Sequence, residues 1–269
     1  MEKPQITPRI TGERIKEYLK EDKRFDGRKP LEFREISIET GVSENAEGSA
    51  RVKIGKTEVL VGIKMKIGEP YPDSPNEGNM MVTAELLPLS SPRFENGPPR
   101  FPAIELGRLT DRLIRESKFI DTKSLCIKEG EKVWTVFVDV YSINDDGNLL
   151  DAAAIGAITA LKSARIPEYN LEEDKVYFGK LTDKKLPLTD MPLFPKTFHK
   201  IGDKFIVDPT REEEDISKTR VTIGSSGGII HSMQKGESES LSIEELYSLL
   251  DSNEKVEKEL SEKIGKFLK

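Results

Sequence analysis

The sequence predicts an α+β fold, in which mixed β-sheets pack against helices without the strict strand–helix alternation of a doubly wound protein. Three observations predict it. Tight turns join alternating strand-like runs, residues 132–143 are apolar on both faces, and helical patterns stand singly between the strands. The chain has 269 residues, of which 36% are apolar and 33% charged. This is the composition of a folded globular protein with one large domain or two small ones.

The first element is a short surface helix. Ile15 and Leu19 lie one turn apart among charged residues, which predicts a helix over residues 11–21 with Thr11 as its N-cap. The expected division is residues 1–21, an N-terminal helical segment, and residues 22–269, a single domain.

Alternating apolar residues predict the strands. The clearest pattern runs through residues 51–67, where apolar and polar residues alternate on both sides of the turn Gly55-Lys56. Residues 132–143 have the two apolar faces of a strand in the middle of a sheet. Further strands are expected over residues 31–39, 79–87, 193–200, 205–207, 219–223 and 229–233.

The predicted helices lie between these strands. Four prolines make residues 92–102 a loop. The following helix, over residues 103–118, is expected to bury a stripe of three leucines: Leu106, Leu109 and Leu113.

Two more helices are predicted from their first turns. An alanine-rich helix over residues 150–164 follows Asn148, a residue that often caps helices. A long charged helix follows Ser242, and Ser242 and Glu245 form an S-x-x-E capping box.

Composition excludes several kinds of protein. The chain has 42 Lys and Arg against 48 Asp and Glu, a formal charge of −6, which excludes a protein that coats nucleic acid with its whole surface. Cys126 is the only cysteine, so an internal disulfide and a cysteine-cage zinc site are excluded, and we expect it to be buried. The two histidines, His199 and His231, have no metal-ligand spacing and are expected to be ordinary core or surface residues.

No membrane or nucleotide-loop signal is present. Apolar runs stay well below the ~20 residues that span a bilayer, and the N-terminus lacks the apolar region of a secretory signal. The sequence therefore predicts a soluble, cytoplasmic protein. Residues 224–228 are glycine-rich but lack the lysine of a P-loop, so a hairpin turn is expected there.

Four blocks of the sequence resemble the RNase PH family. They are Arg24-Phe-Asp-Gly-Arg28, the hairpin 48–57, the stretch 103–112, and the block 145–153. The last block, with its Asn-Leu-Leu-Asp-Ala-Ala, is similar more narrowly to the non-catalytic RNase PH-type subunit of the archaeal exosome ring. The resemblance runs from about Asp22 to the C-terminus and implies an RNase PH-like fold. For the family it implies phosphorolysis, in which phosphate attacks the 3′ end of RNA and releases nucleoside diphosphates.

The phosphate site that the resemblance implies is expected to be lost. In catalytic members a Gly-Ser/Thr-(Ser)-Arg turn at a helix N-terminus binds phosphate through backbone N–H groups, the helix dipole and the arginine. This chain reads Gly147-Asn-Leu-Leu-Asp151 at that place, without the arginine and with a negative charge in the first helical turn. Asn148 and Asp151 are instead expected to cap a buried helix.

The catalytic carboxylate that the resemblance implies is also missing. The strand-end aspartate is Asp208 and an acidic stretch runs to Asp215, but the position of the catalytic aspartate falls at or beside Arg220. The acidic run 208–215 is expected to be a solvated loop, and a divalent-ion site is the alternative. We therefore expect no catalytic residue, no metal and no cofactor.

A row of arginines is the remaining candidate site. Arg108, Arg112 and Arg115 are spaced i, i+4, i+7 and share one face of the predicted helix, away from the leucine stripe. Taken alone, the row is explained as solvated surface paired with neighbouring acids: Glu105, Asp111 and Glu116. The resemblance implies instead that arginines of this helix line an RNA path beside the active site of the neighbouring subunit, a task that suits the guanidinium fork.

The function expected on this basis is a non-catalytic structural and RNA-contacting subunit of an exosome-type ring. Its expected partners are a catalytic RNase PH-type paralogue that alternates with it in a hexameric ring, RNA-binding cap proteins and single-stranded RNA. Two alternatives stay open. One is a phosphorolytic 3′ exoribonuclease active on its own, with Asp208 or Asp215 as acid. The other is a metal-dependent enzyme that uses the acids between Asp208 and Asp215.

Overall fold

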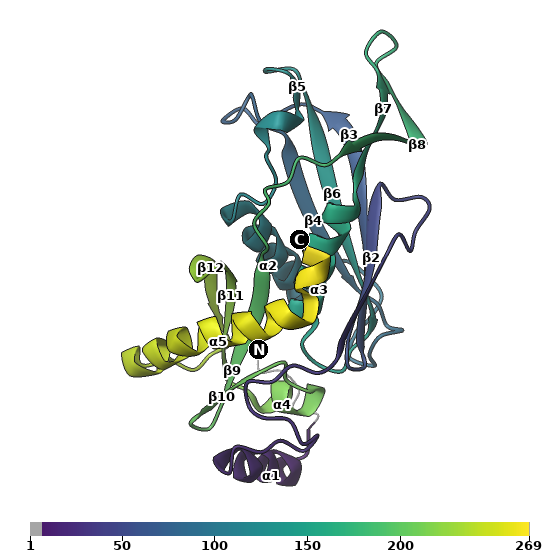
Figure 1. The fold of residues 1–269 in the computed structure, drawn as a ribbon. Coiled ribbons are helices and arrows are strands. Elements are labelled where there is room, and N and C mark those ends of the chain that lie inside the picture. Colours follow the sequence, from purple (N-terminus) through teal and green to yellow (C-terminus); the bar gives the residue numbers. More distant parts are fainter. Residues whose placement is uncertain (1–6, 269) are drawn as a thin grey trace.

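The computed structural model describes residues 7–268 and confirms the α+β fold (Figure 1). A 3-10 turn over Lys123–Leu125 and five helices occur in this part of the chain: α1 (Arg9–Lys20), α2 (Phe101–Glu116), α3 (Leu149–Ser163), α4 (Arg211–Ile216) and α5 (Ile243–Leu268). The strands are β1 (Ile36–Thr40), β2 (Gly48–Ile54), β3 (Thr57–Gly68), β4 (Asn79–Leu86), β5 (Cys126–Lys128), β6 (Lys132–Asn144), β7 (Arg165–Asn170), β8 (Lys175–Lys185), β9 (Phe194–Ile201), β10 (Lys204–Val207), β11 (Thr219–Ser226) and β12 (Ile229–Gly236).

The strands form two main sheets and a separate hairpin. The larger sheet has the order β1-β2-β3-β6-β4, with β5 beside β6. Strand β6 lies inside it, antiparallel to β3 and parallel to β4, as its two apolar faces predict. The smaller sheet is antiparallel in the order β10-β9-β11-β12, and β7 and β8 pair only with each other.

Helix α3 fills the space between the two main sheets. It packs against β2, β3 and β6 of the larger sheet and against β9 of the smaller one. Twelve of its fifteen residues are buried, which its alanine-rich sequence permits because small side chains let the helix approach both sheets closely. Helix α2 packs against α3, β4 and β12 and keeps one face exposed.

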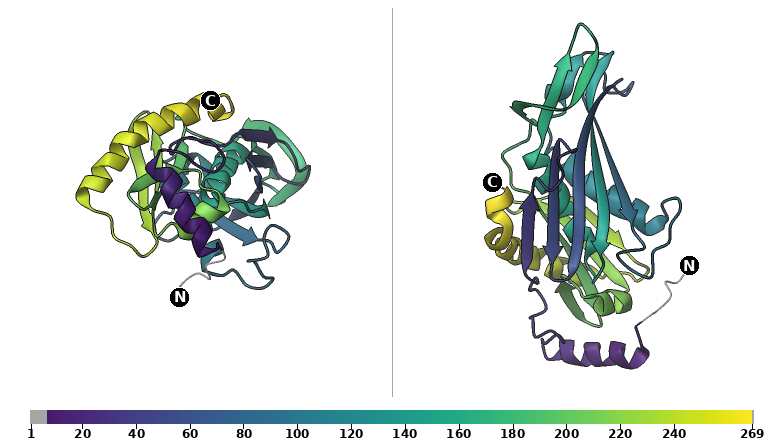
Figure 2. Two further views of the ribbon diagram at one scale, coloured as in Figure 1. Left: turned by 90° about the horizontal axis from the view of Figure 1, so that it is seen from below. Right: turned by 90° about the vertical axis from the view of Figure 1, so that its right-hand side faces the viewer.

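The terminal helices lie at different places around this core, α5 along one side and α1 at the lower end (Figures 1 and 2). Helix α5 crosses the smaller sheet and buries Leu249, Val256, Leu260 and Ile264. Helix α1 lies at the lower end of the molecule next to α4, where Ile15 and Leu19 join a small second core with Ile216. None of the helices in the described range is long and apolar enough to cross a membrane.

Several local expectations were wrong. Helix α1 starts at Arg9 after Pro8, so Thr11 lies inside the helix and is not its N-cap. Cys126 begins the short edge strand β5 and is half-buried rather than buried. Helix α2 starts two residues earlier than expected, because a proline is tolerated in the first turn of a helix.

The structure also contains elements that were not predicted. The β7–β8 hairpin projects beyond the larger sheet (Figure 1), and most of its residues are exposed on both faces. The acidic run is not a solvated loop, because residues 211–216 form α4, in which Glu213 and Ile216 are buried.

The capping box before α5 is confirmed, since the amide of Glu245 donates to Ser242 Oγ and the amide of Ser242 donates to Glu245 Oε2.

Candidate functional site

The turn before α3 is tightly packed against the segment that leads into α4. Gly147 has a left-handed φ of 84°, and a Cβ there would lie 2.5 Å from the carbonyl oxygen of Pro209. Only glycine fits such a position without strain. Asn148 follows with a φ of 62°, also left-handed. The chain thus makes the sharp turn that a phosphate loop needs, but another part of the same chain lies directly on it.

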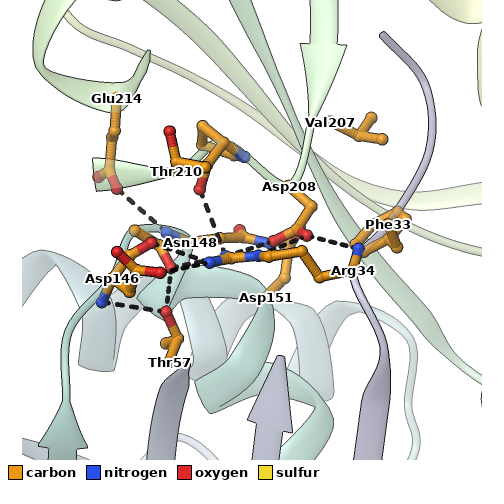
Figure 3. Close-up of polar contacts among 12 residues, drawn as sticks. Phe33, Arg34, Thr57, Asp146, Asn148, Asp151, Val207, Asp208, Thr210 and Glu214 are labelled. Atoms are coloured by element: carbon orange, nitrogen blue, oxygen red, sulfur yellow. Dashed lines mark hydrogen bonds and ion pairs between the residues drawn. The ribbon is translucent and has the colours of Figure 1, made fainter. Parts of the chain in front are cut away.

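The amides of this turn are occupied by the chain itself (Figure 3). The amide of Asn148 donates to Glu214 Oε2 at 3.1 Å, and that of Gly147 donates to Asp145 Oδ1 at 3.1 Å. The amide of Asp146 donates to Thr57 Oγ1 at 3.1 Å. A carboxylate from α4 therefore accepts from one of the amides at this helix N-terminus that would otherwise be available to an anion. A phosphate would have to displace Glu214.

Asp208 is the hub of the network beside the turn (Figure 3). Its buried carboxylate accepts from Arg34 at three nitrogens (2.7 to 2.9 Å), from Arg28 Nη1 at 2.9 Å and from Asn148 Nδ2 at 2.8 Å. Burial raises the pKa of Asp208, but the hydrogen bonds and charge of Arg34 and the charge of Arg28 outweigh it and hold this pKa below its usual value. Asp208 is an ionised anchor, unsuited to donate a proton at neutral pH.

The two residues expected to cap α3 do something else. The Asn148 side chain makes no cap hydrogen bond and turns towards Asp208. The Asp151 carboxylate is fully buried and accepts from the backbone amide and the hydroxyl of Thr197 on β9, at 3.1 and 2.7 Å. Burial raises the pKa of Asp151 to about 6, even though the bonds from Thr197 oppose the shift. These residues tie α3 to the smaller sheet.

The acids of α4 are paired with distant arginines. Asp215 accepts from Arg93 at 2.5 and 2.6 Å, and Glu213 forms a buried pair with Arg24, the first residue of the Arg-Phe-Asp-Gly-Arg block. Arg211 bridges Asp145 and Asp215. Within residues 7–268, no group of three or more His, Cys, Asp or Glu residues is placed to hold a metal ion.

Arg220 lies at or beside the position that the resemblance assigns to the catalytic carboxylate. It lies on β11, is almost fully buried, and pairs with Glu105 of α2 and, at 3.0 Å, with Glu237. The side chain thus carries the opposite charge to a catalytic acid and holds α2 against the smaller sheet. Glu105 was one of the acids expected to pair with the arginine row, and it pairs with Arg220 instead.

The arginine row lies on the exposed face of α2. Arg115 is engaged by Asp111 at 2.7 Å, and Arg112 Nη1 donates to Gln234 Oε1 at 3.2 Å. Arg108 is exposed and has no hydrogen-bond or ion-pair partner among the described residues. The structure therefore brings the three arginines to one surface, and two of them keep most of their donors free.

Models of known families match most of the chain. The 3′ exoribonuclease family, domain 1, matches residues 32–167, and the 3′ exoribonuclease family, domain 2, matches residues 196–252. These are the two parts of the RNase PH family.

Individual relatives are similar over nearly the whole chain. The exosome complex component Rrp42 of Thermococcus kodakarensis is 42% identical over 268 residues, which cover 99% of this chain and 98% of that protein. The protein of the same name from Methanothermobacter thermautotrophicus is 47% identical over 235 residues, covering 87% and 86%.

Solved structures agree with these matches. A chain of the Archaeoglobus fulgidus exosome with RNA bound to the active site has a TM-score of 0.86 at 42% identity, covering 95% of this chain and 98% of that chain. Rice (Oryza sativa) Rrp46 has a TM-score of 0.68 at 18% identity, covering 91% of this chain and 100% of that one, and this likeness shows the fold alone.

Proposed function

The chain belongs to the RNase PH family of 3′ exoribonucleases, and from this premise we propose that it is a non-catalytic, RNA-contacting subunit of an archaeal exosome. One observation carries the proposal. In the turn that would bind phosphate, Glu214 and Asp145 accept from the amides of Asn148 and Gly147, and Arg220 lies at or beside the position expected for the acid. The chain keeps the fold of the enzyme family and lacks its anion site and acid.

The relatives suggest the setting in which such a subunit works. They are named as exosome components, and one similar chain belongs to an archaeal exosome with RNA bound to the active site. We propose that this chain alternates with a catalytic paralogue in a hexameric ring, with RNA-binding cap proteins on one face, in the cytoplasm. The proposed division is an N-terminal helical segment, residues 1–21, and a single domain, residues 22–269, of which residues 1–6 and 269 lie outside the described part of the chain.

The arginine row is proposed to hold the RNA backbone. A guanidinium presents a planar fork of N–H donors that matches two phosphate oxygens, so Arg108 and Arg112 suit a strand passing along α2. Arg115 contributes less, because Asp111 already accepts from both Nε and Nη2 of its guanidinium. Contacts of this kind bind any sequence, since the phosphate carries no base information.

Both alternatives conflict with the contacts at the acids. An enzyme active on its own would need Asp208 or Asp215 as proton donor, yet the pKa of each lies below its usual value because arginine bonds outweigh the effect of burial. A metal enzyme would need these carboxylates to face a common ion, and Arg28, Arg34 and Arg93 hold them instead. Calorimetric titration with Mg²⁺ and Mn²⁺ tests the second alternative and should show no binding.

Activity of the purified chain tests the proposal directly. We expect the isolated chain to release no nucleoside diphosphate from RNA in the presence of phosphate, and the ring co-expressed with a catalytic paralogue to release it. Turnover by the lone chain, free of contaminating nuclease, would refute the non-catalytic assignment. Failure of the two chains to assemble would refute the ring.

A further inference from the structure

A cavity of about 230 Å³ lies beside the arginine row and is lined by residues of α2, α3, β9, β11 and β12. Its walls are largely apolar and include Leu109, Leu113, Leu150 and Ala154. Polar groups from α2 and β12 complete the lining: Arg112, Glu116, His231 and Gln234. The cavity belongs neither to the turn before α3 nor to the pairs of Arg220, and of the contacts described above only the hydrogen bond from Arg112 to Gln234 lies at its wall.

The lining selects for a small, uncharged, flat group. Both α2 and α3 contribute apolar side chains to the lining, which suits a ring with apolar faces. Arg112 and Glu116 carry opposite charges, so an isolated anion would meet a carboxylate and an isolated cation a guanidinium. The volume is below the ~300 Å³ of the smallest common drug-sized pockets, which leaves room for one ring system and not for a whole nucleotide.

One polar atom at this wall has no partner. Nε2 of His231 is buried and makes no hydrogen bond with any described residue. A buried polar atom without a partner is uncommon in folded proteins, and such an atom commonly binds a water or a ligand. An imidazole nitrogen donates or accepts according to its tautomer, so His231 is able to pair with either kind of atom on the edge of a heterocycle.

Arg112 links the cavity to the row, since it belongs to both. A strand whose phosphate is bound by Arg112 therefore has the attached base next to the cavity. We propose that this cavity takes one nucleobase of the single-stranded RNA whose phosphates the arginine row holds. Apolar side chains contact the faces of the base, and Glu116, His231 and Gln234 pair with its edge, a common way of binding unstacked bases. The inference rests on the proposed function and adds a base-binding site to it.

Two substitutions fill the cavity without touching a charge. A Cβ at Gly224 would overlap Leu113 Cδ1 and lie 2.8 Å from Ser232 Oγ, and all three residues line the cavity, so Gly224→Ala is expected to reduce its volume. Ala154→Val adds methyl groups to a lining residue of α3. Arg108→Ala is the matched control, because Arg108 belongs to the row but does not line the cavity.

The test measures RNA affinity of the ring co-expressed with its paralogue, in phosphate-free buffer, as a function of salt. The probes are an oligouridylate and a series of strands with one abasic nucleotide moved along the chain. We expect each filling variant to weaken oligouridylate binding about five- to tenfold, the lower part of what one base contact contributes. The salt slope should not change, whereas Arg108→Ala should flatten it.

Abasic strands provide the second comparison. At one position the abasic nucleotide should weaken binding as much as Gly224→Ala does, and on that strand neither filling variant should have any further effect. Unchanged oligouridylate affinity in a folded filling variant, or equal weakening on every strand, would overturn the base site and leave the proposed function intact. If replacing Arg108 and Arg112 changes neither the RNA affinity nor the salt slope, both the base site and the proposed RNA-contacting function are overturned. Thermal unfolding shows whether each filling variant is folded. If one of them is not, the RNA affinity of the other filling variant decides whether the cavity binds a base.

Discussion

The turn before α3 and the exposed face of α2 use arginine in opposite ways. Around the turn, Arg34 and Arg28 are buried against Asp208, and Arg211 is held by acids of its own chain. On α2, Arg108 has no partner among the described residues and Arg112 has only an amide oxygen. The same side chain stabilises the fold where its charge is satisfied internally and remains available to a ligand where it is not.

This contrast explains how a catalytic framework persists without catalysis. The turn keeps its left-handed glycine and its helix N-terminus, the features that suit an anion. The carboxylate of Glu214, from the same chain, takes the place of an external anion and accepts from the amide of Asn148. Substitutions at the turn should therefore change stability, and substitutions on the row should change RNA binding.

The largest expected effect is at the hub of the turn. Asp208→Ala leaves Arg28 and Arg34 without their shared carboxylate in a buried site, so we expect a loss of ~3–5 kcal/mol in the free energy of unfolding, measured by denaturant titration. Asp146→Ala is the control, because this half-buried acid makes one long contact of 3.4 Å with Arg34. It should cost less than ~1 kcal/mol. Similar losses for both variants would contradict the role of Asp208.

Arg220 should come next. Arg220→Asp places a third carboxylate beside Glu105 and Glu237, so we expect a loss of about 3 kcal/mol, the lower end of the range for a broken buried pair, since both acids keep some contact with water. The variant should gain no phosphorolytic activity. Leu149→Arg should gain none either, because Glu214 still occupies the turn. Nucleoside diphosphate release by either single variant would show that the site is less altered than the contacts imply.

A smaller, pH-dependent effect is expected from Asp151. Its pKa is raised to about 6 in the folded chain, from 3.8, so its contribution to stability is complete below pH 4 and is lost as pH rises through 6. Asp151→Asn removes this proton binding. The wild type should lose stability relative to the variant between pH 4 and 6, by at most about 1.4 kcal/mol per pH unit. A constant difference across this range would contradict the raised pKa.

The parts of the fold predicted from sequence are those with local periodicity. The hairpin of β2 and β3, the central strand β6 and the buried stripe of α2 follow from the spacing of apolar residues alone. The β7–β8 hairpin escaped prediction because residues exposed on both faces show no alternation. Helix α4 escaped because an acidic run looks solvated unless the arginines that neutralise it are known.

In the candidate site, too, features set by local spacing were predicted and long-range pairings were not. The arginine row was predicted, because residues one helical turn apart share a face in any helix. The pairing of Arg220 with Glu105, of Asp215 with Arg93 and of Asn148 with Glu214 joins residues far apart in the chain, and no local pattern announces it. The role of Asp208 and Asp215 as ionised anchors therefore became visible only in the structure.

Replacing Arg108 and Arg112 tests the contrast between the turn and the row most directly. The measurement is RNA affinity of the assembled ring against salt concentration, for the wild type and for Arg108→Ala, Arg112→Ala, with Arg115→Ala as the weaker control. We expect normal assembly, unfolding free energies within ~0.5 kcal/mol of the wild type, and a slope of log K against log salt flattened by about 0.7 for each lost phosphate contact. Unchanged affinity and slope in a correctly assembled ring would mean that the row is ordinary solvated surface.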